Sequence, residues 1–138
     1  MKITLFTSDK TRHNYLIKLL SQVCKKLFVV QEKSKNLSET TPDNYIKSEI
    51  VNDYFKKVNT AQKKIFGDKY NVSKIKNTKI LDIQSGSLSK ISIDKISDFL
   101  KSDVYVVFGS SYIKNELVNF LIKKKAINIH MGISPYYR

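Results

Sequence analysis

Two polar side chains near the end of the sequence, Asn128 and His130, have the chemistry of a catalytic pair. They alternate with Ile127 and Ile129 in an apolar run, residues 126–130, which predicts a buried strand with the amide and the imidazole on one face. An amide N–H can stabilise a developing negative charge, and an imidazole can transfer a proton near neutral pH. Open α/β sheets hold their active sites at the carboxyl ends of such strands. The alternative is that the two side chains only satisfy each other's hydrogen bonds.

A second polar pair, Arg12 and His13, follows a predicted first strand at residues 2–7. Ser8 or Asp9 can cap the helix that begins here, so the pair is expected in its first turn, at the same edge of the sheet. Two interpretations stay open: Arg12 contacts an anionic group of a substrate, or the turn is simply solvated. The turn lacks the Gly-x-Gly-x-x-Gly pattern, so NAD and FAD are not expected.

Hydrophobic periodicity along the chain predicts alternating strands and helices. The predicted strands are residues 2–7, 27–31, 79–83, 104–108 and 126–130, and the predicted helices begin near residues 9, 43, 92 and 113. Residues 32–43 are polar and rich in helix breakers, which predicts a loop. A strand-helix-strand unit implies a right-handed crossover between parallel strands. The fold class is therefore expected to be α/β, with a doubly wound, mostly parallel sheet in a single domain.

Two of the predicted helices carry clear apolar faces. The first has five apolar side chains at helical spacing, which are expected to face the core: Tyr15, Leu16, Leu19, Leu20 and Val23. The long helix from Asp43 carries a longer set: Ile46, Ile50, Tyr54, Phe55, Val58, Ala61, Ile65 and Phe66. Gly67 is expected to end this helix, because glycine readily adopts the left-handed conformation that closes many helices.

The composition limits the possible partners. The net charge of +13 comes mostly from Lys spread along the chain, and Arg occurs only at Arg12 and Arg138, so sequence-specific nucleic-acid binding is disfavoured whereas a small anionic substrate suits the charge. The single cysteine, Cys24, is expected to be a buried core thiol. No apolar run is long enough to cross a bilayer and no signal peptide precedes the first strand, so a cytoplasmic location without membrane contact is expected.

The motif residues together resemble a known family. Asn128-Ile-His130 with Pro135 and Arg138 beyond it, and Gly109-Ser-Ser-Tyr-Ile113 after the strand at 104–108, resemble the signature of the folate-dependent formyltransferases. This family includes methionyl-tRNA, glycinamide ribonucleotide and sugar N-formyltransferases. The resemblance follows the whole chain in order and corresponds to the family's N-terminal catalytic domain, which has a Rossmann-like fold.

The resemblance implies a reaction and a set of roles. The co-substrate would be 10-formyltetrahydrofolate, with no metal, and its formyl group would pass to a primary amine of a sugar nucleotide, a tRNA-bound amino acid or a small metabolite. Nucleic acid would be a partner only if the acceptor is a tRNA. Asn128 would stabilise the oxyanion and His130 would move the proton. The residues implied for the folate are Gly109, Ser111, Tyr112, Ile113 and Lys114, and those for the acceptor are Arg12, Ser134 and Arg138.

The resemblance also implies that one catalytic residue of the family lies outside residues 1–138. The family's third catalytic residue is an aspartate downstream of the histidine, on a segment that residues 1–138 do not contain. Residues 1–138 are therefore expected to be an incomplete formyltransferase-like domain, lacking its C-terminal part and inactive alone. The alternative is a non-catalytic module of the same fold that binds folate or another anion.

Overall fold

The computed structural model describes residues 1–33, 49–67 and 70–130 of the 138-residue chain. Strands and helices alternate, as the hydrophobic periodicity predicts. In chain order the elements are β1 (Lys2–Ser8), α1 (Thr11–Val23), β2 (Lys26–Lys33), α3 (Glu49–Phe66), η2 (Val72–Lys74), β3 (Thr78–Gln84), η3 (Ser87–Ser89), η4 (Asp94–Leu100), β4 (Val104–Phe108), α4 (Asn115–Lys123) and β5 (Ile127–Ile129). All five predicted strands are present.

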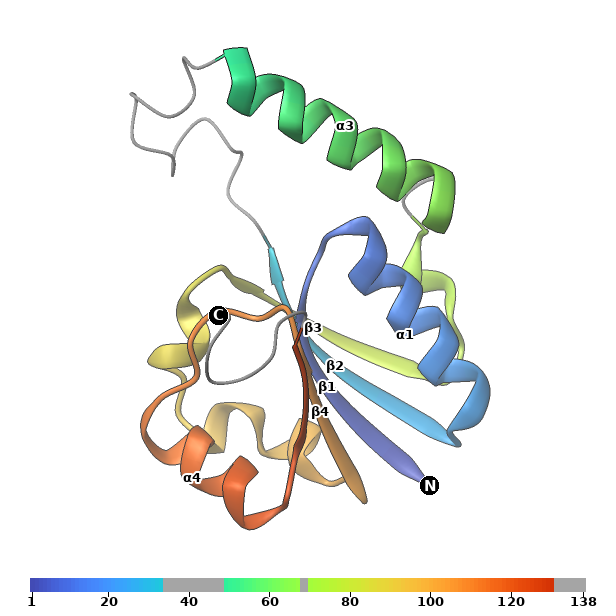
Figure 1. Cartoon of the computed structure of the whole chain (residues 1–138). Helices are drawn as coiled ribbons and strands as arrows, with labels where there is room; N and C mark the ends of the chain where they lie inside the picture. The colour runs from blue at the N-terminus through green and yellow to red at the C-terminus, as the bar shows by residue number, and fades with distance from the viewer. Residues whose placement is uncertain (34–48, 68–69, 131–138) are drawn as a thin grey trace.

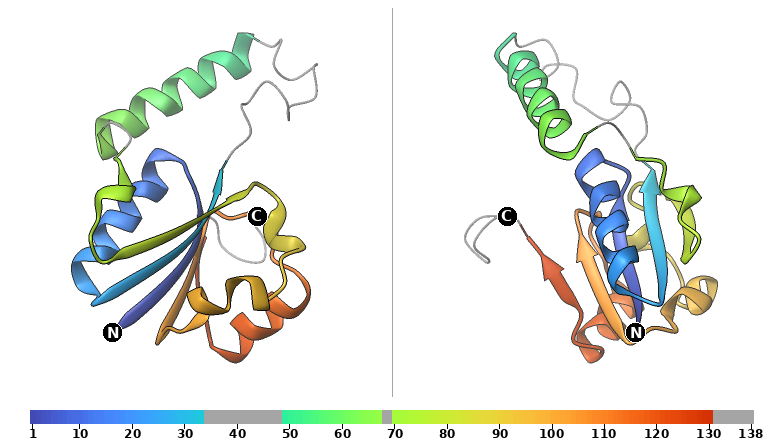
Figure 2. Two further views of the ribbon diagram at one scale, coloured as in Figure 1. Left: turned by 180° about the vertical axis from the view of Figure 1, so that it is seen from behind. Right: turned by 90° about the vertical axis from the view of Figure 1, so that its right-hand side faces the viewer.

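The five strands form one parallel sheet in the order β3-β2-β1-β4-β5. The chain steps outward from β1 to β3 and then returns to the other side of β1, so the strand order reverses between β1 and β4. Helix α1 lies on one face of the sheet, whereas η4 and α4 lie on the other (Figures 1 and 2). This confirms the predicted α/β class with a parallel sheet covered on both faces. In such sheets the carboxyl ends of the two strands that flank the reversal form a natural ligand crevice.

Two apolar clusters hold the helices on the sheet. Successive residues of a strand point to opposite faces, so Leu5 packs with Ile17 of α1, whereas Phe6 packs with Leu117 of α4. Cys24 is buried in the first cluster, as predicted. No helix among the described residues is long and apolar enough to cross a bilayer.

The predicted inward face of α1 is partly wrong. Leu19 and Val23 are exposed, whereas His13, Asn14 and Ile17 are buried. His13 and Asn14 are drawn inward because they form hydrogen bonds with Ser8 and Gln31, and the helix is rotated accordingly. The apolar spacing could not reveal this, because the side chains that set the rotation are polar.

Helix α3 is described only from Glu49, so the predicted start at Asp43 lies outside the described residues. It ends as predicted at Gly67, which has a φ of +75° and donates its N–H to the carbonyl of Lys63 at 2.9 Å. The helix lies apart from the sheet beyond α1 (Figure 2), and no residue of α3 is buried. Its contact with α1 includes the rings of Tyr15 and Phe66, whose centroids are 5.5 Å apart.

The prediction of a buried strand at residues 126–130 is wrong within the described part of the chain. Strand β5 pairs with β4 and forms an edge of the described sheet, and Ile127 and Ile129 are 55% and 40% exposed. The sequence pattern indicates an extended segment but not how many neighbours it has, because central and edge strands can carry the same apolar residues.

Candidate functional site at the carboxyl edge of the sheet

The β1–α1 turn and the loop after β4 meet where the strand order reverses. The imidazole of His13 lies directly against Gly109: a Cβ atom added to this glycine would lie 2.3 Å from His13 Cε1. Gly109 has a φ of +63°, so the close approach and the backbone conformation both require glycine. The ring of Phe108 packs edge-on against the imidazole, with centroids 4.7 Å apart, and the Thr7 hydroxyl donates to the Phe108 carbonyl at 2.7 Å. His13 therefore fills the space between the β1–α1 turn and the start of the loop after β4.

The hydrogen bonds of His13 define its protonation. Arg12 Nε lies 3.2 Å from His13 Nε2, and Ser8 Oγ lies 2.7 Å from Nδ1. Because a guanidinium can only donate, Nε2 is the unprotonated nitrogen and Nδ1–H donates to Ser8. Burial, followed by the positive charges of Arg12 and Lys10, lowers the pKa of His13 from 6.5 to about 4. The imidazole of His13 is thus uncharged at neutral pH. Because His13 is buried, the interpretation that the first turn is solvated is wrong for this residue.

Arg12 is held from one side by this imidazole. Its Nε donates to His13, which leaves the terminal guanidinium nitrogens as the groups able to contact a ligand. Arg12 is half-buried at the start of α1, beside the strand-order reversal. Its position is consistent with the predicted contact to an anionic group. The start of helix α1 differs from the prediction that Ser8 or Asp9 caps it. Lys10 is the N-cap and makes no side-chain capping bond, and the Ser8 hydroxyl is hydrogen-bonded to His13 instead.

Glu32 is a functional candidate that the sequence prediction missed. The predicted strand ended at residue 31, but β2 continues to Lys33, and Glu32 is only 1% exposed. Its carboxylate accepts hydrogen bonds from Gly86 N at 2.8 Å, Ser111 N at 2.6 Å and Ser111 Oγ at 2.6 Å. The signal that could have identified it is an acidic residue directly after a buried apolar run, at the edge of the sheet where α/β proteins bind ligands.

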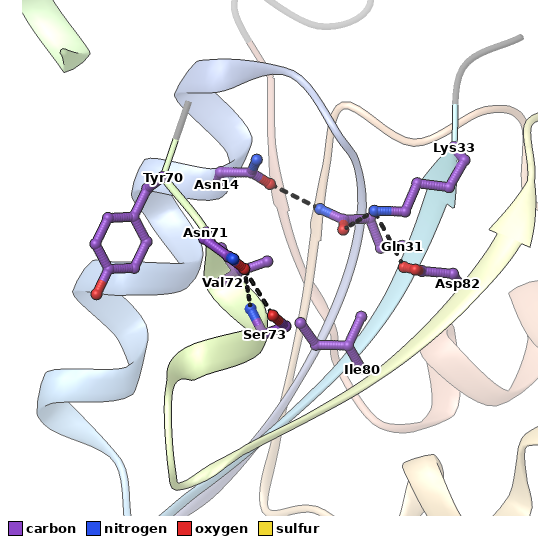
Figure 3. A pocket seen from close by; sticks show the side chains of 9 residues that line it. All are labelled: Asn14, Gln31, Lys33, Tyr70, Asn71, Val72, Ser73, Ile80 and Asp82. Carbon is purple, nitrogen blue, oxygen red and sulfur yellow. Dashed lines mark hydrogen bonds and ion pairs between the residues drawn. The ribbon is translucent and has the colours of Figure 1, made fainter. Parts of the chain in front are cut away.

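A polar hollow of about 540 Å³ lies on the α1 face of β2 and β3 (Figure 3). Gln31 Nε2 donates to Asn14 Oδ1 at 2.8 Å, and Lys33 Nζ lies 2.9 Å from Gln31 Oε1 and 3.3 Å from Asp82 Oδ1. The rest of the lining consists of Tyr70, Asn71, Val72, Ser73 and Ile80. These polar groups largely satisfy one another, and none of the predicted site residues lines the hollow.

The predicted catalytic residues and the predicted folate-binding loop lie at the ends of two neighbouring parallel strands, β5 and β4. Asn128 is in β5 opposite Val107 of β4, and His130 follows the end of β5. The loop formed by residues 109–114 (the 109–114 loop) follows β4 and therefore leaves at the same edge of the sheet. Both Asn128 and His130 are exposed, not buried as predicted.

The 109–114 loop presents a mixture of anchored and exposed residues. Ser111 is held by Glu32, whereas Tyr112 is 76% exposed and Lys114 is also exposed. Ile113 is half-buried and packs against the apolar cluster beneath α4. An anchored loop with exposed side chains on it is an arrangement able to present groups to a ligand.

Two of the predicted acceptor-binding residues, Ser134 and Arg138, lie outside the described residues. Within residues 1–33, 49–67 and 70–130, no group of three or more His, Cys, Asp or Glu side chains could hold a metal ion.

Gly109→Ala is predicted to destabilise the protein more than Gly86→Ala, which is a matched control. Both glycines have positive φ, so each alanine costs about 1–2 kcal/mol in the backbone. A Cβ at Gly86 meets no atom within 4 Å, whereas at Gly109 it overlaps the imidazole and adds about 1–3 kcal/mol. Urea unfolding would measure the difference.

The His13→Ala background provides a second control for this prediction. There the extra cost of Gly109→Ala should largely disappear, because the overlapping ring is absent. Equal costs for the two glycine variants in the wild-type background would show that the His13–Gly109 contact is not tight.

The free energy of unfolding is predicted to fall with decreasing pH through a window set by His13. Above pH 6.5 the ring is neutral in both states. Between 6.5 and about 4 the unfolded chain binds a proton that the folded chain does not, so stability decreases as pH falls. The slope from this residue is at most about 1.4 kcal/mol per pH unit.

Urea unfolding at pH 7.5, 6 and 5 would test this pH dependence. His13→Gln should flatten the profile in this window. An identical profile for wild type and His13→Gln would contradict the assignment.

No protein-family model, curated protein or solved structure matched the chain. The functional assignment therefore depends on the residues at the carboxyl edge of the sheet and on the motif resemblance.

Proposed function

We propose that the protein is an N-formyltransferase that transfers the formyl group of 10-formyltetrahydrofolate to a primary amine. The observation that carries the proposal is the parallel pairing of β4 with β5, in which Val107 lies opposite Asn128. The 109–114 loop and His130 consequently leave the sheet at one edge, beside the strand-order reversal where ligands bind in this class of fold. The motif resemblance supplies the reaction, and this pairing brings the two motifs to neighbouring strands.

The proposed chemistry needs one donor and one proton carrier. The amine nitrogen attacks the formyl carbon, and the carbonyl oxygen becomes an oxyanion that the Asn128 side chain stabilises by donating its N–H. A donor aimed at such an oxygen in a water-excluded site contributes about 3–4 kcal/mol. The carbon–N10 bond then breaks. His130 accepts the proton from the attacking nitrogen and returns it to N10, so that tetrahydrofolate and the formamide are the products.

The remaining predicted residues bind the two substrates. The main-chain groups of the 109–114 loop would pair with the edge of the pterin ring, and the exposed rings and chains of Tyr112 and Lys114 would contact the rest of the folate. Arg12 would bind an anionic group of the acceptor, such as the phosphate of a nucleotide-linked sugar. Ser134 and Arg138 stay predictions for the acceptor. The basic net charge of +13 favours acceptors that carry phosphate.

A second candidate function is a module that binds folate or another anion without turnover. The observation in its favour is the exposure of β5, since Ile127 and Ile129 are 55% and 40% exposed. An oxyanion hole is effective only where water is excluded, and an exposed amide gives little stabilisation beyond that of water. The two candidates differ in whether a formyl group is transferred.

Asn128→Ala is predicted to lower kcat about 100- to 1000-fold, because the oxyanion loses its donor. The assay would incubate the complete natural protein with 10-formyltetrahydrofolate and a panel of amines: an amino-sugar nucleotide, an aminoacyl-tRNA and a small aminated ribonucleotide. Mass spectrometry would detect the formamide, and absorbance would follow tetrahydrofolate. His130→Asn should also lower kcat while leaving folate binding nearly unchanged.

Asn119→Ala on the exposed side of α4 is the matched control and should keep wild-type turnover. Folate binding without a formylated product from any amine would favour the binding module. Turnover that survives loss of both Asn128 and His130 would overturn their assigned roles.

A further inference from the structure

Glu32 connects three segments at the carboxyl edge of the sheet. It is in β2, directly opposite Ser8 of β1 and Ile83 of β3. Its carboxylate accepts from Gly86, in the turn after β3, and from Ser111, in the loop after β4. Because β1 lies between β2 and β4, this side chain reaches past the end of β1 and spans the strand-order reversal.

Among the described residues, every polar group that contacts the Glu32 carboxylate donates a hydrogen bond to it, as a carboxylate requires. Oε1 accepts from Gly86 N and from Ser111 Oγ, and Oε2 accepts from Ser111 N, at distances of 2.6–2.8 Å. Such short distances are typical of hydrogen bonds to a charged acceptor. A carboxylate that is 1% exposed is costly unless donors replace its water, so the two loop segments must keep their positions for the charge to stay buried.

Two exposed residues follow Ser111 in the loop, and within the described part of the chain no hydrogen bond like that of Ser111 to Glu32 holds them. Tyr112 and Lys114 follow Ser111 within three positions and are exposed. Gln31 and Lys33 point to the opposite face of β2, toward the hollow beside α1 (Figure 3), so they do not help Glu32 to hold the loop. The conformation of the 109–114 loop is thus determined by Gly109 at one end, by the hydrogen bonds of Ser111 to Glu32 and by the packing of Ile113.

We propose that Glu32 is a positioning residue that holds the 109–114 loop in the conformation that binds the pterin end of the folate. This inference rests on the proposed function for the identity of the ligand. Glu32 itself acts through Ser111: it fixes the loop backbone, whose N–H and C=O groups would meet the pterin. The residue should therefore affect the affinity for folate much more than the rate of formyl transfer once folate is bound.

The loop-ordering part of the proposal is tested without any ligand. Glu32→Gln keeps the shape of the side chain but replaces one oxygen by an NH₂ group, so its single remaining oxygen cannot occupy the position opposite Gly86 N and the position opposite Ser111 N at once. The exchange of the amide hydrogens of Gly86 and Ser111, followed by NMR, should accelerate at least tenfold relative to wild type for at least one of the two. Asp82→Asn is the matched control: Asp82 is at the same edge of the sheet and pairs with Lys33, so it should leave both amides unchanged.

The ligand part is tested with the complete natural protein and 5-formyltetrahydrofolate, a folate whose formyl group cannot leave from N10. Glu32→Gln should raise its Kd at least tenfold, and Asp82→Asn should leave it within twofold. In the transfer assay, KM for 10-formyltetrahydrofolate should rise while kcat stays within about threefold. Ser111→Ala removes only the hydroxyl bond and keeps the amide bond, so it should give a smaller increase in Kd; it also serves if Glu32→Gln does not fold.

The outcomes separate this inference from the proposed function. Wild-type protein that binds no folate would overturn the proposed function and with it the pterin assignment. Unchanged exchange of both the Gly86 and the Ser111 amide in Glu32→Gln would overturn the role of Glu32 whichever ligand binds. Faster exchange with unaltered folate affinity would show that the anchor only stabilises the fold, and would also overturn the proposal.

Discussion

The carboxylate of Glu32 is the constraint on which the arrangement at the carboxyl edge of the sheet depends. A charge can stay buried only where enough donors converge on it, and here the donors come from two segments separated by two strands of the sheet. The turn after β3 and the loop after β4 are therefore placed by one side chain of β2. This is why β2 extends beyond its apolar part: the strand must carry Glu32 past the core to reach both segments.

The opposite face of the sheet is organised by a second set of buried polar groups. Gln31 donates to Asn14 and to the Ser8 carbonyl, and these bonds orient the first turn of α1. The same turn carries His13, whose neutral imidazole occupies the space beside Gly109. The two sets meet at Ser8, which lies opposite Glu32 in the sheet and bonds to His13 through its hydroxyl. The residues beside the strand-order reversal thus fix one another, and Arg12 is half-buried next to them.

The sequence predicted the fold well because the fold depends on patterns that neighbouring residues share. Each strand is a run of apolar or β-branched residues, and a β-α alternation with short turns permits few arrangements besides a parallel sheet. It predicted Gly67 as a helix end and Cys24 as buried, because these depend on local sequence. It could not predict the hydrogen bonds of Glu32, whose partners are 54 and 79 positions away in the chain. Nor could it predict the rotation of α1, which depends on pairings of His13 and Asn14 with β1 and β2.

The exposure of β5 decides what the proposed pair can do. An amide that competes with water contributes about 0.5–1.5 kcal/mol per hydrogen bond, whereas one aimed at an oxyanion in a dry site contributes about 3–4 kcal/mol. The difference is close to two powers of ten in rate, so Asn128 becomes an effective catalyst only when something excludes water from it. His13 fills the space beside Gly109, so a ligand of the proposed function would lie above it, over the ends of β4 and β5. A flat pterin ring held by the 109–114 loop in that position would itself cover the edge beside Asn128. Under the proposed function, the co-substrate would in this arrangement supply part of the dry environment in which its own formyl group reacts, and the anchoring of that loop by Glu32 would be a condition for the chemistry at β5.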